Sequence, residues 1–262
     1  MKKIPQRAII VGATSGIGYE IALLLIQEGW KLGITGRRKE NLETLQALYP
    51  DQICIRSFDI RQSGAEKELE ALINDLGGMD LFLQSSGIGF QNYTLEPEIE
   101  LNTLETNGIG FARMVTHAFR YFLQKGSGHL AVISSIAGTK GLGIAPAYSA
   151  TKRFQNTYLD ALEQLARMHK VSIRFTDIRP GFVATGLLND GKHYPLLMSP
   201  AYAAHKIVSA LHPKKRVAII DWRYQILVFF WHLIPAWLWK RLPIRYNTDI
   251  EALRFTGFSY GS

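Results

Sequence analysis

The amino-terminal part of the chain places a short apolar strand, a glycine-rich turn and a helix in immediate succession. Ala8 to Val11 is a branched apolar run that predicts a buried parallel strand. Residues 12–18, Gly-Ala-Thr-Ser-Gly-Ile-Gly, follow at once, and apolar residues at helical spacing continue from Tyr19 to Glu28. Glycines let a backbone approach a pyrophosphate, and a helix N-terminus offers free N–H groups and a positive dipole end. This order predicts a dinucleotide site that uses Gly12, Thr14, Ser15, Gly16, Ile17 and Gly18. The alternative is a turn that needs only positive φ angles.

A tyrosine and a lysine four residues apart form the second informative pattern. On a helix, Tyr148 and Lys152 share one face. A lysine ammonium beside a phenol favours the phenolate, so we expect Lys152 to lower the pKa of Tyr148 from its ordinary value of about 10. Such a group can exchange protons near neutral pH. The hydroxyl of Ser135 can hold a carbonyl or alcohol oxygen beside it. Taken alone, Tyr-x-x-x-Lys is common by chance, and most instances are surface helix pairs.

With these motifs the chain resembles the short-chain dehydrogenase/reductase family over about Arg7 to Ile220. The resemblance implies hydride transfer between a nicotinamide cofactor and a carbonyl or alcohol, with Tyr148 as proton donor and Ser135 orienting the substrate oxygen. It also implies that Lys152 holds the nicotinamide ribose and that Asn107 positions Lys152 through a water molecule. The catalytic residues implied in this way are Asn107, Ser135, Tyr148 and Lys152.

The same resemblance implies further contacts with the cofactor. Asp59 matches the acid that contacts the adenine, and the segment 180–185 matches the one that turns under the nicotinamide, with Thr185 on its carboxamide. The cofactor residues implied outside the glycine turn are Asp59, Ser86, Gly87, Tyr148, Lys152, Pro180, Gly181, Val183 and Thr185.

Two positions depart from the family pattern. Val11 stands where a threonine usually precedes the first glycine, and residues 84–87, Gln-Ser-Ser-Gly, stand where Asn-Asn-Ala-Gly is usual. In the family the threonine and the middle asparagine support each other. Because both partners are replaced here, we expect a small energetic effect and intact chemistry.

Strand-like and helix-like segments alternate along the chain. This alternation predicts a doubly wound parallel α/β sheet of Rossmann type with helices on both faces. We expect one domain over residues 1–221, followed by an apolar helical extension over 222–262. The later strands are expected at 31–35, 53–57, 80–84, 129–134, 172–178 and 216–220. The later helices are expected near 40–48, 65–76, 99–123, 148–168 and 201–211.

Charge at the end of the second strand indicates the form of the cofactor. Enzymes that use NAD usually place an acid here, whereas an arginine accommodates the 2′-phosphate of NADP. Arg37 and Arg38 follow this strand, and the strand end carries no acid. Arginine also binds phosphate with a planar fork. We therefore predict NADP rather than NAD, with two solvated helix-start charges as the alternative.

An irregular stretch follows the nicotinamide segment. Residues 186–199 carry apolar side chains that suit a lid over a lipophilic substrate, namely Leu187, Leu188, Tyr194, Leu196 and Leu197. The alternative is an ordinary surface loop. The substrate class is otherwise open, and a long-chain keto lipid, a retinoid or a steroid would fit.

The carboxyl-terminal extension joins aromatic and basic residues. Residues 224–239 are apolar except Gln225 and His232, and Pro235 interrupts them. The run is shorter than the ~20 residues that span a bilayer. Between His212 and Arg245 there are seven Lys or Arg against one Asp. We expect 224–245 to lie on a membrane surface, and packing on its own domain or on a partner subunit is the alternative.

Composition sets further expectations. The net charge of +8 is concentrated near the carboxyl terminus, so it does not indicate a nucleic-acid surface. Cys54 is the only cysteine and is expected in the core without a disulfide. The histidines lack ligand spacing, so we expect no metal. No signal peptide is visible, and we expect a cytoplasmic protein with peripheral membrane contact as an open alternative.

These observations lead to one expected function and two alternatives. We expect an NADP(H)-dependent oxidoreductase. The family resemblance also implies a homodimer or tetramer, paired through the helices that carry Asn107 and Tyr148. A nucleotide-sensing protein without turnover would tend to lose the tyrosine or the lysine, which this chain keeps. A membrane-tethered scaffold of the same fold is the other alternative.

Overall fold

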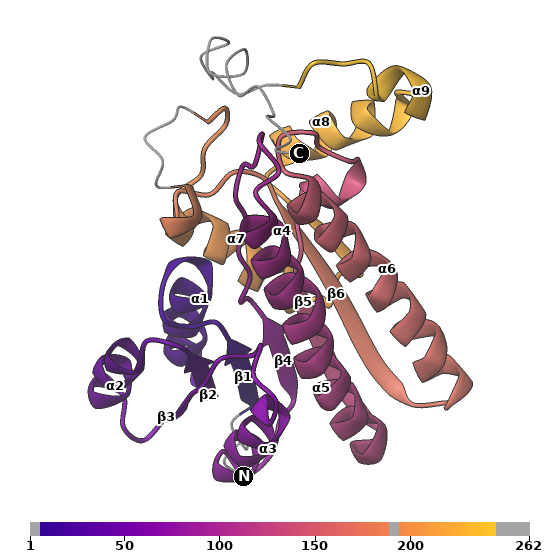
Figure 1. The fold of residues 1–262 in the computed structure, drawn as a ribbon. Coiled ribbons are helices and arrows are strands. Elements are labelled where there is room, and N and C mark those ends of the chain that lie inside the picture. The colour runs from indigo at the N-terminus through magenta and orange to yellow at the C-terminus, as the bar shows by residue number, and fades with distance from the viewer. Residues whose placement is uncertain (1–5, 189–193, 245–262) are drawn as a thin grey trace, which may run out of the picture.

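The computed structural model describes residues 6–188 and 194–244 (Figure 1). Residues 1–5 of the predicted domain, 189–193 of the predicted lid and 245–262 of the predicted extension lie outside the described residues, and this last range includes Arg245. The side chain of Leu187 also lies outside the description.

Seven parallel strands form one sheet in the order β3-β2-β1-β4-β5-β6-β7. The strand order reverses between β1 and β4, where Ile9 is paired with Gly33 on one side and with Phe82 on the other. In doubly wound sheets a ligand binds beyond the carboxyl ends of the strands at such a reversal. The strands are β1 (Arg7–Val11), β2 (Lys31–Gly36), β3 (Ile53–Ser57), β4 (Leu81–Gln84), β5 (Ser127–Ile133), β6 (Ser172–Pro180) and β7 (Val217–Ile220).

Helices cover both faces of the sheet, as the alternation of segments predicted (Figure 1). One hydrophobic core joins the sheet to α1 (Gly16–Gln27), α2 (Lys39–Leu48) and α7 (Pro200–Leu211). A second core joins the other face to α3 (Ala65–Asp75), α5 (Phe111–Lys125) and α6 (Pro146–Met168). The strands are buried on both sides, which explains why their sequences are continuously apolar rather than alternating.

The single helix expected at 99–123 is divided in the structure. α4 (Pro97–Leu104) is followed by one π-helical segment, Glu105–Gly110, and then by α5. Two glycines weaken regular α-helix here. A Cβ built at Gly110 would lie 2.8 Å from Cγ1 of Ile60, so this position packs too closely for a side chain. The π-helical segment contains Asn107, one of the predicted site residues. Such segments are frequent at functional sites.

Two helices follow the last strand. α8 (Trp222–Leu233) is capped at its N-terminus by Asp221, whose carboxylate accepts a hydrogen bond from the Arg223 backbone N–H at 2.9 Å. Pro235 separates α8 from the short α9 (Ala236–Trp239). Two short 3₁₀ turns, Ile136–Thr139 and Gly186–Leu188, complete the elements.

The extension packs on its own domain with one side and exposes the other. Tyr224 and Val228 of α8 are buried in the core shared with α1 and α7. The Trp239 indole N–H donates to the carbonyl of Gly141 at 2.7 Å, and the Lys140 ammonium donates to the carbonyl of Ile234 at 2.9 Å. Among the residues described, no helix is long and apolar enough to cross a bilayer.

Candidate functional site

The carboxyl ends of the parallel strands bring the predicted segments to one edge of the sheet. Gly12 follows β1, Arg37 follows β2 and Ser86 lies just beyond β4. Ser135 follows β5 by two residues, and Gly181 follows β6 directly. This edge includes the point where the strand order reverses.

The glycine turn is built for close approach of backbone. Gly12 has a φ of 95°, and a Cβ there would lie 2.5 Å from the backbone nitrogen of Ser86. A Cβ at Gly18 would lie 2.1 Å from the Gly12 carbonyl oxygen, so the first turn of α1 can pack on the loop only without a side chain. α1 begins at Gly16 rather than at Tyr19, and its first turn carries no acidic residue. The residues present therefore fit an anionic group at this helix N-terminus.

Arg38 reaches from the end of β2 to the glycine turn. Its guanidinium Nη2 donates to Thr14 Oγ1 at 2.9 Å and also to Ser15 Oγ. Ser15 occupies the N-cap position of α1, but its hydroxyl makes no capping hydrogen bond. Both Arg37 and Arg38 are exposed at the edge of the site. This cluster of cations and hydroxyl groups can hold a phosphate.

Asp59 lies beyond β3 and is held by a neighbouring arginine. Nη2 of Arg61 donates to its carboxylate at 2.6 Å, and the Arg61 backbone N–H donates to it at 2.9 Å. The Arg61 guanidinium lowers the pKa of the Asp59 carboxyl below its usual range. Asp59 is therefore an ionised and fixed acceptor at neutral pH.

Asn107 is fully buried and fixed by the backbone after β4. Its carboxamide accepts a hydrogen bond from the Ile88 N–H at 2.9 Å and donates to the Ile88 carbonyl at 2.6 Å. The carbonyl of Asn107 accepts a hydrogen bond from Gln155 Nε2 at 2.9 Å. Gln155 in turn accepts one from Lys152 Nζ at 3.2 Å. Gln155 thus links Asn107 to Lys152, and the water molecule that the family resemblance implies between them stays a prediction.

The lysine and the tyrosine of α6 lie together as predicted. Lys152 Nζ is 5.6 Å from the centroid of the Tyr148 ring and donates to the Ile133 carbonyl at 3.1 Å. The Ser135 side chain also lies close enough to the Tyr148 hydroxyl to act on its pKa. A Cβ at Gly89 would lie 2.7 Å from the Tyr148 ring, so the loop after β4 closes on the tyrosine.

We expected Lys152 to lower the pKa of Tyr148, and this prediction is wrong for the structure. Burial raises the pKa of Tyr148, and the Ser135 side chain opposes that rise only in part. Burial also lowers the pKa of Lys152 to about 8, against the opposing charge of Asp177. The cost of desolvating the phenolate and the ammonium therefore exceeds the effect of neighbouring charges. The sequence pattern gives the spacing of the two groups but not their burial.

Ser134 and Ser135 have different surroundings. Ser134 donates to the buried carboxylate of Asp177 and accepts a hydrogen bond from Asn156 Nδ2 at 3.0 Å. Arg179 Nη2 also donates to Asp177, at 2.6 Å. Ser135, the serine that the family resemblance implies, is the one that acts on the pKa of the tyrosine.

The segment 180–185 lies between the glycine turn and the predicted lid. A Cβ at Gly16 would lie 3.1 Å from Cγ2 of Thr185, so this segment approaches the start of α1. Val183 forms a parallel bridge with Met198 of the lid. Tyr194 is buried, and the centroid of its ring lies 4.9 Å from that of Phe182. Its hydroxyl accepts a hydrogen bond from Gln91 Nε2 at 3.1 Å. The described part of the lid therefore packs on the site, while Leu196 and Leu197 are exposed.

The departures at Val11 and Gln84 leave a local polar contact. Gln84 is buried and donates through Nε2 to the Ser86 hydroxyl at 2.7 Å. Its carbonyl oxygen has no hydrogen-bond partner among the described residues. This polar contact of Gln84 and Ser86 flanks Ser85, which stands at the position of the family's middle asparagine.

Comparison with known proteins decides the family. Residues 6–194 match the sequence profile of the family described as short chain dehydrogenase. This chain belongs to the short-chain dehydrogenase family. The matched residues include the glycine turn, the four predicted catalytic residues and the segment 180–185.

Two relatives match this short-chain dehydrogenase over most of its length. An uncharacterized oxidoreductase of Mycobacterium tuberculosis is 29% identical over 246 residues, which are 90% of this chain and 96% of the relative. Dehydrogenase/reductase SDR family member 7B of Bos taurus is 27% identical over 262 residues, with 90% of this chain and 80% of the relative covered.

Solved structures support the fold. A short-chain dehydrogenase of Burkholderia cenocepacia in complex with NADP has a TM-score of 0.79 at 18% identity, covering 94% of this chain and 100% of that one. A short-chain dehydrogenase of Streptomyces avermitilis has a TM-score of 0.76 at 24% identity, covering 89% of this chain and 93% of that one.

Two contacts of this short-chain dehydrogenase site escaped the sequence analysis. Gln155 links Asn107 to Lys152, and its position three residues after Lys152 on the same helix face was the available signal. Tyr224 of α8 contacts the nicotinamide segment, and no pattern in the sequence indicated that α8 would fold back there.

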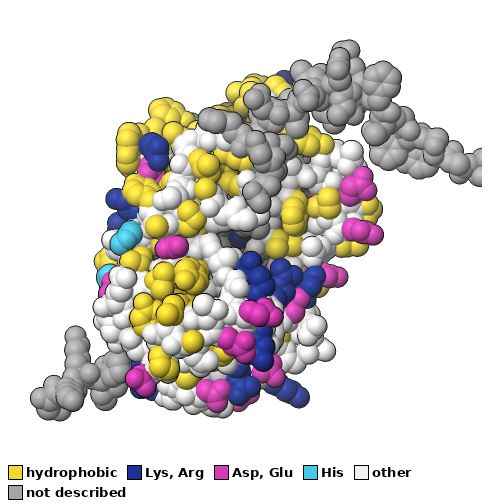
Figure 2. All heavy atoms as spheres, turned by 90° about the vertical axis from the view of Figure 1, so that its left-hand side faces the viewer, with side chains coloured by type: hydrophobic (Ala, Val, Ile, Leu, Met, Phe, Trp, Pro, Cys, Tyr) yellow, Lys and Arg dark blue, Asp and Glu magenta, His cyan; other side chains and the backbone are white. Residues whose placement is uncertain are grey.

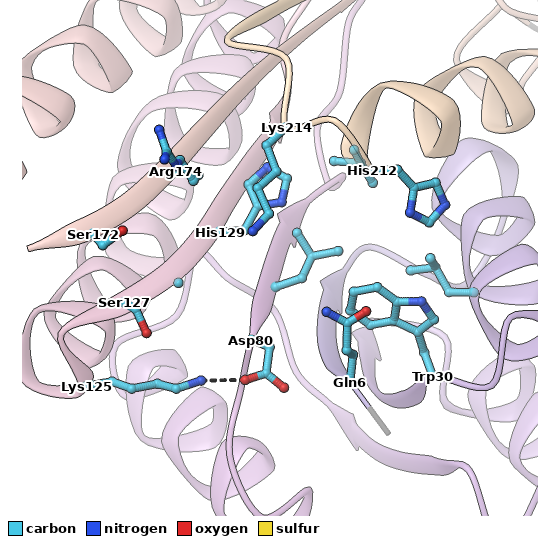
Figure 3. A pocket seen from close by; sticks show the side chains of 14 residues that line it. Gln6, Trp30, Asp80, Lys125, Ser127, His129, Ser172, Arg174, His212 and Lys214 are labelled. Atoms are coloured by element: carbon cyan, nitrogen blue, oxygen red, sulfur yellow. Dashed lines mark hydrogen bonds and ion pairs between the residues drawn. The ribbon is translucent and has the colours of Figure 1, made fainter. Parts of the chain in front are cut away.

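A cavity of about 390 Å³ (Figure 3) lies at the edge of the sheet opposite the four predicted catalytic residues. Its wall includes Asp80, which precedes β4, together with Ser127 and Ser172 at the first residues of β5 and β6. Asp80 forms an ion pair with Lys125 there. None of the described residues that line this cavity belongs to the predicted site, so its volume says nothing about the chemistry.

Proposed function

We propose that this protein is an NADP(H)-dependent oxidoreductase that interconverts a ketone or aldehyde and an alcohol on a lipophilic substrate. The observation that carries the proposal is the meeting of Tyr148, Lys152 and Ser135 at the sheet edge that also holds the glycine turn. Membership in the short-chain dehydrogenase family supports the reaction class.

In reduction, Ser135 and Tyr148 would contact the substrate oxygen, and Lys152 would act on the tyrosine and the cofactor. Bound NADPH would supply the hydride. Ser135 would hold the carbonyl oxygen, and the Tyr148 hydroxyl beside it would donate its proton to that oxygen. The raised pKa of Tyr148 keeps the phenol protonated at neutral pH. Lys152 would stabilise the phenolate left behind and hold the nicotinamide ribose, with its orientation fixed by Gln155.

Charge at the end of β2 supports NADP over NAD. Arg38 contacts the hydroxyls of Thr14 and Ser15, and the exposed Arg37 stands beside it. A 2′-phosphate would accept charge-assisted hydrogen bonds from these groups. The Burkholderia cenocepacia structure of similar fold also contains NADP. Asp59, Ser86, Gly87 and the segment 180–185 would complete the cofactor contacts.

Apolar groups near the site support a lipophilic substrate. Phe182 and Tyr194 stack with their ring centroids 4.9 Å apart, and Leu196 and Leu197 lie exposed beside them. Apolar side chains beside the segment 180–185 favour a hydrophobic carbonyl compound. No residue distinguishes a keto lipid from a retinoid or a steroid.

The outer side of the extension supports contact with a membrane surface. Trp222, Phe229 and Phe230 are 63%, 61% and 57% exposed, far above the values of a packed helix face. Figure 2 shows hydrophobic side chains gathered at the top of the molecule, the level of α8 and α9 in Figure 1. Arg241, whose guanidinium lies 5.5 Å from the Trp237 ring, and Lys240 can meet anionic headgroups.

An apolar stripe on α6 supports a homodimer or tetramer. Phe154, Leu165 and Met168 recur at helical spacing on this helix and are exposed, and Ile109 of the neighbouring π-helical segment is exposed as well. A second copy that buries the stripe would bring the helices of Asn107 and Tyr148 together. Light scattering of Phe154→Glu beside wild type tests this pairing, because an unchanged oligomer would exclude it.

A substrate screen decides between turnover and the non-catalytic alternatives. We expect purified wild-type protein to oxidise NADPH in the presence of long-chain aldehydes, keto lipids, steroid ketones or retinal. A regulatory NADP-binding protein or a membrane-tethered scaffold would bind NADPH and oxidise none of it above the rate without protein. Such a result across all four substrate classes would contradict the enzymatic proposal.

A further inference from the structure

Tyr224 of α8 lies directly beneath the segment that follows β6. The side chain is 1% exposed. A Cβ built at Gly181 would lie 2.1 Å from Cζ of the Tyr224 ring and 2.3 Å from both Cε atoms. Glycine at position 181 is therefore required because an aromatic ring occupies the space of a side chain. The backbone of the segment 180–185 rests on a residue of the carboxyl-terminal extension.

The Tyr224 hydroxyl connects two segments that are distant from α8 in sequence. It accepts a hydrogen bond from the Phe182 backbone N–H at 3.0 Å. It lies 3.1 Å from the carbonyl oxygens of both Pro195 and Leu196. A hydroxyl has one proton, so it donates to one of these two carbonyls at a time while it accepts from Phe182. One buried side chain thus holds the segment after β6 and the described part of the lid.

The two segments are also joined to each other. The Met198 N–H donates to the Phe182 carbonyl at 3.0 Å, and the Ala184 N–H donates to the Met198 carbonyl at 2.9 Å. The backbones of 182–184 and 195–198 therefore form one unit. Tyr224 closes this unit on the side of α8, while Phe182 and Tyr194 stack on each other within it.

We propose that Tyr224 is a positioning residue for the nicotinamide half of the cofactor. The proposal rests on the proposed function for the identity of the ligand and on the contacts above for the role of the tyrosine. Tyr224 fixes the backbone that carries Val183 and Thr185 at the sheet edge. The extension is then part of the active site, because the first turn of α8 supplies the support of the segment under the nicotinamide.

The hydroxyl, rather than the ring, is the part to test. Tyr224→Phe keeps the ring under Gly181 but removes the hydroxyl that accepts from the Phe182 N–H and donates to one of the two carbonyls at a time. Backbone groups that lose a hydrogen-bond partner favour conformations that restore their hydrogen bonds. The segment 180–185 would then sample positions that hold the nicotinamide less well. Misplacement by about 1 Å can reduce the efficiency of an oriented site by up to ~10²-fold.

The control is another tyrosine hydroxyl contact near the start of α8, at a more exposed position. Tyr202 of α7 donates to the Asp221 carboxylate at 2.9 Å, next to the start of α8. Tyr202→Phe removes one tyrosine hydroxyl and one contact between α7 and α8, but leaves the hydrogen bonds of 180–198 in place. An effect of α8 stability alone should appear in both variants.

The test compares NADPH with adenosine 2′,5′-bisphosphate, which lacks the nicotinamide half. Calorimetric titration should give a dissociation constant for NADPH that is raised about tenfold in Tyr224→Phe, below the limit above. The constant for the bisphosphate should change less than about twofold, because the glycine turn and the arginines are untouched. Amide hydrogen exchange at Phe182 should accelerate at least tenfold in Tyr224→Phe and not in Tyr202→Phe.

Each contrary result has a separate meaning. Unchanged NADPH affinity in Tyr224→Phe, or equal weakening of NADPH and the bisphosphate, would overturn the positioning role alone. The same weakening in Tyr202→Phe would also overturn it, since a general effect of α8 would then explain the loss. If wild-type protein binds neither the bisphosphate nor NADPH, the proposed function is wrong, and this role of Tyr224 is wrong with it.

Discussion

At the scale of single residues, burial decides how the catalytic groups are charged. The spacing of Tyr148 and Lys152 is read directly from the sequence, and the structure brings both to Ser135. Their pKa shifts, however, come from desolvation at a depth that a four-residue pattern does not reveal. The contact of Arg38 with Thr14 and Ser15 likewise depends on where β2 ends beside the turn.

The buried lysine predicts a dependence of stability on pH. The folded pKa of Lys152 is about 8, below its unfolded value of about 10.4, so the unfolded chain binds more protons between these two values. Wild-type stability should therefore rise through this window relative to Lys152→Met, by about 3 kcal/mol in the free energy of unfolding. Urea unfolding of both proteins at pH 7.5, 9 and 10.5 measures the difference. A difference that is the same at all three pH values would contradict the depressed pKa.

The arginine pair predicts the choice of cofactor. Arg37→Ala with Arg38→Ala should weaken NADPH binding by at least about tenfold and change NADH binding little, since charge-assisted hydrogen bonds contribute about 1.5–3 kcal/mol each. Lys39→Ala is the matched control, because it removes the next exposed cation along the chain. Calorimetry is the measurement, and equal affinity of wild-type protein for NADH and NADPH would exclude the role of the pair.

At the scale of elements, the sequence predicts strands better than helix interiors. The strand Ile53–Ser57 was predicted to the residue, and the other strands differ at their ends. The division of the expected helix 99–123 follows from tertiary contacts, namely Asn107 on Ile88 and the packing at Gly110. Neither contact leaves a signal in local periodicity. The half-buried Cys54 of β3 is also less enclosed than a core position implied.

The same limit applies to the extension, whose two sides could not be separated by sequence alone. The aromatic composition indicated an interface of some kind, but not that Tyr224 and Trp239 face inward while Trp222 and Phe229 face outward. Only the packing of α8 against the site distinguishes these residues. We therefore propose membrane contact for the outer side of the extension only.

The exposed side of α8 predicts binding to anionic vesicles. Wild-type protein should co-sediment at low salt with vesicles of phosphatidylcholine and phosphatidylserine, and binding should weaken as salt screens the basic flanks. Phe229→Ser with Phe230→Ser should reduce binding at least about tenfold, because both apolar side chains leave the interface. Leu48→Ser with Leu101→Ser, two exposed apolar residues on other helices, is the control. Absence of wild-type binding at low salt would exclude the membrane contact.

At the scale of the whole molecule, one parallel sheet gathers the site. Each predicted segment follows the carboxyl end of a strand, so the order β3-β2-β1-β4-β5-β6-β7 brings residues from six strands to one edge. The sequence therefore predicted which residues meet. It could not predict the links among them, such as Gln155 between Asn107 and Lys152, because these depend on side-chain placement across two elements.

The most direct test of the account is the steady-state rate of Tyr148→Phe with NADPH and the carbonyl substrate that wild-type protein reduces fastest. The substitution removes the proton donor and little volume, so NADPH affinity should stay near that of wild type while kcat falls by about 10²–10⁴-fold. Loss of NADPH binding along with activity would indicate a structural defect instead. A Tyr148→Phe enzyme that keeps the wild-type kcat would contradict the assignment of Tyr148 as the proton donor of this site.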